Sequence, residues 1–246
     1  MPFKHSESVL DASLSLSGWH YPTQEDCRAL GALRRLPGTC FGLAGRLGTL
    51  RIGAHHGALA WLLSDSAMFA AEARRLDGLL WDAQKKSLAL PGSHKNAPVG
   101  LLTLNSYLDE LKTLVLVEGM PDYYAALELA INSEHNFRVA TMLGSACSIE
   151  FDPAFALGIA SADLRKARVL IIPHNDGAGV IAATRWSRQL YALEVAEVQI
   201  QRLPDKYKDL NDFVSADPDN AREILQWIQA PSQSPNPAQG NPGICR

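Results

Sequence analysis

The sequence has few cysteines and no long apolar run. Its four cysteines are widely spaced along 246 residues and form no Cys-x-x-Cys pair, which disfavours a zinc site built from such pairs. Scattered, unpaired cysteines are typical of a reducing cytosol. No stretch of about 18 apolar residues occurs, and the N-terminus lacks the basic, apolar and small-residue order of a secretory signal. We therefore expect a cytoplasmic protein with no membrane partner.

Charge and nucleotide-binding motifs are also limited. The formal net charge is −3, which excludes a protein that is basic throughout but not one with a local basic face. The first apolar strand of the second half is not followed by Gly-x-Gly-x-x-Gly, and no Walker A sequence is present. Dinucleotide binding and P-loop hydrolysis are therefore disfavoured.

Shifts in residue pattern divide the chain into five segments. Residues 1–20 are polar and serine-rich and are expected to form an arm. Residues 231–246 are rich in proline, glycine and polar residues, which predicts a disordered tail. Between them we expect a small domain over residues 21–110, a second domain over 111–216 and a C-terminal helix over 217–230.

Residues 21–110 show one helical segment followed by short alternating segments. Thr23 is a candidate N-cap with Asp26 at the capping-box position, and leucines follow at helical spacing as far as Pro37-Gly38. Turn residues then separate three predicted strands, over 47–52, 59–63 and 68–76. This pattern predicts a mixed α+β unit with a mainly antiparallel sheet.

Residues 111–216 alternate between apolar strands and helices. Strands are predicted over 113–117, 138–143, 168–172 and 195–203. Helices are predicted over 122–131, 151–160 and 179–193. Fully apolar strands separated by helices favour an α/β fold, in which helices cover both faces of a parallel sheet.

Acidic loops follow three of these strands. Parallel strands bring their carboxyl ends to one edge of a sheet, where such folds bind ligands. The candidate residues are Glu118, Asp122, His174, Asp176, Asp209 and Asp212. Any single loop is explained by turn formation or helix capping, but three converging acidic loops predict a site for Mg²⁺ or Mn²⁺.

These motifs resemble the Toprim domain, and most closely that of bacterial, phage and plasmid DNA primases of the primase-helicase branch. The resemblance is carried by Glu118-Gly119 with Asp122, by His174-Asn-Asp-Gly-Ala-Gly and by Lys208-Asp-x-Asn-Asp. Residues 72–78, 85–86 and 90–93 resemble the small domain that precedes Toprim in primase cores. The resemblance spans residues 40–216 and implies a Rossmann-like parallel sheet flanked by helices after a small mixed subdomain.

The resemblance also implies roles for the acidic residues. Glu118 matches a glutamate that acts as general acid/base or metal ligand, and Asp176 matches the second aspartate of an Asp-x-Asp motif, so both are candidate catalytic residues. The candidate metal ligands are all six residues of the acidic loops. His174 stands where the family has the first aspartate, and imidazole is a poor ligand for Mg²⁺. The site could hold one metal, prefer Mn²⁺, or bind nucleotide without turnover.

The resemblance further implies that basic residues line a groove leading to the acidic site, where a net-negative protein would concentrate the positive charge that binds phosphates. The alternative for any single lysine is a place on a solvated strand face. The candidates are Arg74, Arg75, Lys85, Lys86, Lys95 and Lys208. Arg74 and Arg75 are adjacent on a predicted strand and point to opposite faces, so at most one should reach a given ligand. Cys147 is a weaker candidate, because a nucleophilic thiol would need a histidine partner that the sequence does not identify.

The function implied by the resemblance is primer synthesis in DNA replication, with a single-stranded DNA template, NTPs and a divalent metal. No zinc-binding module or helicase motor is visible, so either would lie on another polypeptide or outside the given sequence. A mobile-element setting is typical of this branch. Two alternatives remain open: a metal-dependent nuclease of the same fold, and a non-catalytic module that binds DNA or a replication partner.

Overall fold

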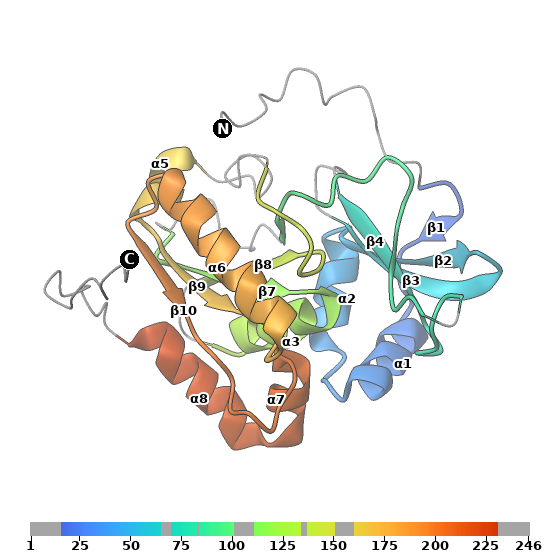
Figure 1. Ribbon diagram of the computed structural model, residues 1–246. Coiled ribbons are helices and arrows are strands. Elements are labelled where there is room, and N and C mark those ends of the chain that lie inside the picture. Colours follow the sequence, from blue (N-terminus) through green and yellow to red (C-terminus); the bar gives the residue numbers. More distant parts are fainter. Residues whose placement is uncertain are drawn as a thin grey trace, which may run out of the picture.

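The computed structural model describes residues 16–64, 70–82, 84–100, 111–133, 137–150 and 160–230. These residues form two five-stranded sheets and the helices around them (Figure 1). The arm as far as residue 15, residues 151–159 of the helix predicted over 151–160, and the tail over 231–246 lie outside the described residues. Ala160 is the N-cap of the next helix, over 161–166.

The first sheet is antiparallel, as predicted, with strand order β1-β2-β3-β4-β5. Its strands are β1 (Trp19–His20), β2 (Leu50–His55), β3 (Ala58–Ser64), β4 (Ala71–Arg75) and β5 (Leu88–Ala89). Strand β1 comes from the expected arm, where Trp19 and His20 pair with Gly53 and Ile52 of β2. The end of the arm is therefore part of the sheet.

Two helices accompany this sheet, one predicted and one not. Helix α1 (Gln24–Arg34) begins with the predicted capping box: the Thr23 hydroxyl accepts from the Asp26 amide at 3.2 Å, and the Asp26 carboxylate accepts from the Thr23 amide at 2.8 Å. Helix α2 (Thr39–Arg46) was not predicted, and the strand expected from residue 47 begins only at Leu50. The burial of Cys40, Phe41 and Ala44 stabilises α2 despite its two glycines.

The second sheet has the order β10-β9-β7-β8-β6. Four strands are parallel, as predicted: β7 (Thr113–Glu118), β8 (Phe137–Met142), β9 (Arg168–Ile172) and β10 (Glu197–Ile200). Strand β6 (Val99–Gly100) pairs antiparallel with β8 at the edge, so the segment before β7 adds a fifth strand.

Helices cover both faces of the second sheet (Figure 1). Val115 and Val117 of β7 share a core with α3 (Met120–Ile131), α7 (Leu210–Ala216) and α8 (Pro218–Gln229). Leu114 and Leu116, which point the other way, share a core with α5 (Ser161–Lys166) and α6 (Gly177–Ala192). This alternation is the reason that residues 114–117 of β7 are all apolar.

A common core joins the two sheets. Tyr124 of α3 packs against Phe41 of α2, with ring centroids 4.7 Å apart, and against Trp61 of β3 at 5.6 Å. These aromatic contacts hold the first sheet beside the carboxyl ends of the parallel strands. Among the described helices, none is both long and apolar enough to cross a membrane.

Candidate functional site

A cavity of about 400 Å³ lies where β7 and β9 end and the first sheet approaches. That volume is within the range of small-molecule sites, roughly 300–1,000 Å³. All six predicted acidic-loop residues line it, and so do five cations: Arg34, Arg74, Arg75, Lys86 and Lys208. The sequence therefore predicted correctly that the three loops converge.

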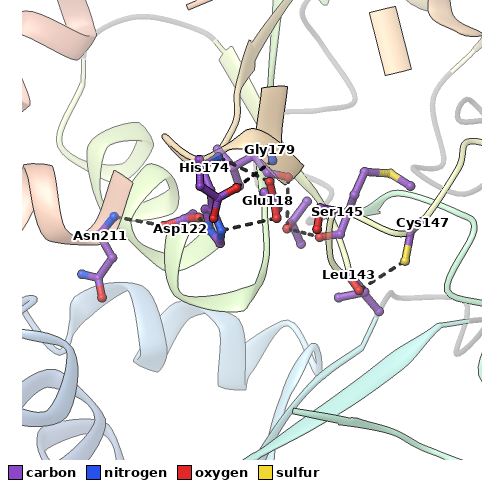
Figure 2. A network of polar contacts seen from close by, with 12 residues as sticks. Glu118, Asp122, Leu143, Ser145, Cys147, His174, Gly179 and Asn211 are labelled. Atoms are coloured by element: carbon purple, nitrogen blue, oxygen red, sulfur yellow. Dashed lines mark hydrogen bonds and ion pairs between the residues drawn. The ribbon is translucent and has the colours of Figure 1, made fainter. Parts of the chain in front are cut away.

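His174 lies between two buried carboxylates (Figure 2). Its Nε2 is 2.8 Å from Asp122 Oδ2, and its Nδ1 is 3.3 Å from Glu118 Oε1. The Glu118 side chain is 5% exposed and that of Asp122 is 1% exposed, whereas that of His174 is 25% exposed. The imidazole thus neutralises charge that the carboxylates could not hold alone in a buried position.

The pKa values at this cluster reflect burial and pairing. Burial alone lowers the pKa of His174, but the hydrogen bond and charge of Asp122, with the charges of Glu118 and Asp209, outweigh it and raise the pKa to about 9. Burial raises the pKa of Asp122 to about 6, even though the contact with His174 acts in the opposite direction. An imidazolium between two carboxylates is therefore the expected state at neutral pH.

Local backbone geometry places these side chains. Gly119 links β7 to α3 with a φ of +93°, a backbone conformation that residues other than glycine rarely adopt. The turn puts Asp122 in the first turn of α3, where its Oδ1 accepts from the Asn211 amide at 3.0 Å. At the start of α6, a Cβ on Gly179 would lie 2.2 Å from the His174 carbonyl oxygen. Only glycine allows α6 to begin this close to His174.

The other acidic residues cap helices beside the cluster. Asp176 Oδ1 accepts from the Gly179 amide at 2.9 Å, and Asp209 Oδ1 accepts from the Asp212 amide at 2.8 Å. Asp212 lies 3.4 Å from Arg35, and both side chains are exposed. Capping and cavity lining coexist here, because one oxygen of a carboxylate can cap while the other stays free.

Part of this group can hold a metal ion. Asp122, His174 and Asp209 each offer one ligand atom, and within the described part of the chain these atoms lie within 4.8 Å of one another. Two carboxylate oxygens and one imidazole nitrogen suit Mn²⁺ better than Mg²⁺, which prefers oxygen ligands alone. Glu118, Asp176 and Asp212 line the cavity but lie outside this group.

Cations from both halves of the chain line the same cavity as the acidic cluster. Burial and the neighbouring charge of Arg74 lower the pKa of Arg34 to about 10, so Arg34 stays protonated at neutral pH. The charge of Lys208 is the main cause that lowers the pKa of Lys86. In the described residues, neither Arg34 Nε nor Arg74 Nε has a hydrogen-bond partner. Half-buried arginines with a free donor, gathered beside other cations, are a feature of anion sites.

Arg34 was not predicted from the sequence, because it lies in α1, far along the chain from every motif. Its guanidinium carbon lies 5.2 Å from the centroid of the Trp61 ring, which places the side chain over the core aromatic residue and at the cavity. The only signal that could have indicated it is a basic residue in the last turn of the predicted helix, a position that normally complements the helix dipole.

Three predicted basic residues have different surroundings. Arg75 lines the cavity as Arg74 does, contrary to the expectation that at most one of the two would reach a given ligand. However, its guanidinium is paired with Asp77 at 2.5 Å. Lys95 forms an ion pair with buried Glu72 at 2.7 Å, and Lys85 is part of a backbone bridge with Trp81. Neither Lys85 nor Lys95 lines the cavity.

The loop after β8 is fixed by α6 and contains Cys147. Arg185 donates to the backbone carbonyls of Ser145 and Cys147, and Trp186 Nε1 donates to the Cys147 carbonyl at 2.7 Å. The Cys147 thiol is buried, donates to the Leu143 carbonyl at 3.2 Å (Figure 2), and has a pKa raised by burial. These features describe a structural thiol rather than a nucleophile.

Comparison with known proteins shows the fold. No protein-family model matches the chain, and no curated protein matches its sequence. The primase fragment of the bacteriophage T7 primase-helicase protein matches with a TM-score of 0.55 and 15% identity, over 92% of this chain and 82% of that one. A second match is to primase domains bound to an RNA/DNA hybrid and dTTP, in a complex with bacteriophage T7 lagging-strand DNA polymerase. Its TM-score is 0.50 and its identity 15%, and it covers 81% of this chain and 89% of that one. The DnaG catalytic core matches with a TM-score of 0.49 and 18% identity, over 90% of this chain and 69% of that one. The chain therefore has a primase-core-like fold.

Proposed function

We propose that the chain is a primase-type nucleotidyltransferase that binds single-stranded DNA and NTPs and synthesises primers. The observation that carries the proposal is the charge pattern of the cavity: Arg34 of α1, Arg74 of β4 and the loop residues Lys86 and Lys208 line it together with the acidic and imidazole cluster. A nucleoside triphosphate with a divalent metal has the complementary pattern, because its phosphates need cations and its metal needs carboxylates. The primase-core-like fold supports this reaction over others.

In this proposal Asp122, His174 and Asp209 would hold the metal, which would supply positive charge to the triphosphate when bound. Arg34, Arg74, Lys86 and Lys208 bind the remaining phosphate charge. The 3′-oxygen of the primer bonds to the α-phosphorus while the bond to the β-phosphate breaks, and pyrophosphate leaves. The proton of the hydroxyl passes to a carboxylate, a role that we assign to Glu118, with Asp176 beside it.

We also propose the wider setting that the resemblance implies. The cavity belongs to a Toprim domain over residues 111–216 that works with the small domain over 21–110 in cytoplasmic DNA replication. A helicase or zinc-binding module on another polypeptide would supply unwinding or template selection. The first structural relative is itself a fragment of a primase-helicase protein, which supports this kind of partner.

A second candidate is a non-catalytic module that binds DNA or a replication partner. One observation favours it: both ring nitrogens of His174 are engaged by Asp122 and Glu118, so a protonated imidazole already occupies space between the carboxylates. A metal would have to displace that proton. If it does not, the cavity binds nucleotide without turnover.

The test is primer synthesis from labelled NTPs on single-stranded DNA, run separately with Mn²⁺ and Mg²⁺. We expect template-dependent products with Mn²⁺, and a loss of about 100-fold or more in Glu118→Gln. Glu25→Gln is the matched control, since it makes the same change at an exposed position of α1. Shortened DNA without primers would favour a nuclease, and DNA binding without either product would favour the binding module.

A further inference from the structure

Two exposed leucines stand at the rim of this otherwise polar cavity. Leu79 is 62% exposed and Leu80 is 41% exposed, and both line the cavity together with Arg34, Arg74 and Lys86. A single exposed leucine is ordinary on a protein surface. Two adjacent ones at the mouth of a charged cavity form an apolar lip, which we define as Leu79 and Leu80.

A hydrogen bond and close packing hold the turn that carries the lip. Asp77 Oδ1 accepts from the Leu79 amide at 3.0 Å and from Arg75 Nε at 3.0 Å. Gly78 turns with a φ of +76°, and a Cβ there would lie 2.9 Å from Leu33 of α1, so the turn packs closely on that helix. These contacts fix the backbone at Leu79, which lowers the entropy lost when a ligand binds there.

A nucleotide has two chemically different ends that match the two parts of the cavity lining. The cations suit its phosphates, and the apolar lip suits the face of its base, which loses water when it is buried against apolar side chains. We infer that Leu79 and Leu80 hold the nucleobase of the nucleotide whose phosphates are bound by Arg34, Arg74, Lys86 and Lys208. The inference rests on the proposed function, because it deepens the assignment of the same cavity. Arg75 is then a positioning residue, since it fixes Asp77 and thereby the lip.

The test compares binding of ATP with binding of inorganic tripolyphosphate, which has the phosphates but no base. Titration calorimetry with Mn²⁺ present is run on wild type, on the double variant Leu79→Asn/Leu80→Asn, and on Leu59→Asn. Leu59 is a matched control, because it is 53% exposed in β3 and does not line the cavity. Arg74→Gln serves as the control for phosphate binding.

We expect the double variant to bind ATP about tenfold more weakly, which corresponds to about 1.4 kcal/mol, and to bind tripolyphosphate as wild type does. Arg74→Gln should weaken both ligands, and Leu59→Asn neither. Unchanged ATP affinity in the double variant would overturn the inference and leave the proposed function standing. A loss of tripolyphosphate binding in the double variant would also overturn it, because the effect would then come through the fold. Failure of wild type to bind either ligand would refute the proposed function together with the inference.

Discussion

The contact of His174 with Glu118 and Asp122 makes folding stability depend on pH in a predictable direction. The pKa of His174 is about 9 in the folded protein, against 6.5 for an ordinary histidine. A group whose pKa is raised by folding contributes stability that is fully present below 6.5 and is lost as the pH rises through 9. Each unit of pKa is worth about 1.4 kcal/mol, so the contribution is about 3 kcal/mol.

The neighbouring carboxyl acts in the same direction. The pKa of Asp122 is raised to about 6 by burial, so its proton too is held more tightly in the folded protein than in the unfolded chain. The stability that this carboxyl contributes is lost as the pH rises from about 4 to about 6, which is below the pH range in which the contribution of His174 is lost. The two effects are therefore separable along the pH scale.

The assay is urea unfolding of metal-free wild type and His174→Asn at pH 6, 7.5 and 9.5. We expect wild type to be more stable than the variant by about 3 kcal/mol at pH 6, and this difference to shrink toward zero by pH 9.5. His56→Asn is the control, because His56 lies in an exposed hairpin turn with a φ of +45°, which asparagine tolerates. Equal stability differences at all three pH values would refute the claim that an imidazolium joins the two carboxylates.

Three further predictions follow from the same contacts. His174→Asp should shift metal preference from Mn²⁺ toward Mg²⁺ in calorimetric titrations, and should abolish the ¹⁴N coupling that pulsed EPR of bound Mn²⁺ should show in wild type. Arg74→Gln should weaken tripolyphosphate binding about tenfold without loss of thermal stability. Lys95→Gln should leave binding unchanged but lower the unfolding temperature, because the substitution removes the ion-pair partner of buried Glu72. Gly179→Ala should destabilise the protein by about 1–3 kcal/mol in urea unfolding, because its Cβ would overlap the His174 carbonyl; a neutral result would contradict the close approach of α6.

The fold was predictable where local chemistry and burial agree. Thr23 and Asp26 formed the expected capping box, and the apolar runs at β7 and β9 became adjacent parallel strands. Helix α2 was missed because its two glycines disfavour a helix locally, and packing of Phe41 on Tyr124 overrides that preference. Packing of this kind depends on residues about 80 positions apart, which no local pattern reveals.

The candidate site shows the same division. The three acidic loops were predictable, because each follows a strand and parallel strands end at one edge. Arg34 and the lip of Leu79 and Leu80 were not, since their position depends on how α1 and the turn after β4 pack against the second sheet. Lys95 was assigned to nucleic acid although it pairs with Glu72, because a sequence does not show which charges are already neutralised.

The central claim is that one cavity binds both the triphosphate and the metal, and crystals soaked with Mn²⁺ and a non-hydrolysable NTP test it most directly. The account predicts an anomalous manganese peak in contact with Asp122, His174 and Asp209, with phosphates against Arg34 and Arg74 and the base on Leu79 and Leu80. Manganese or nucleotide bound elsewhere, with the His174 imidazole still in contact with both carboxylates, would contradict it.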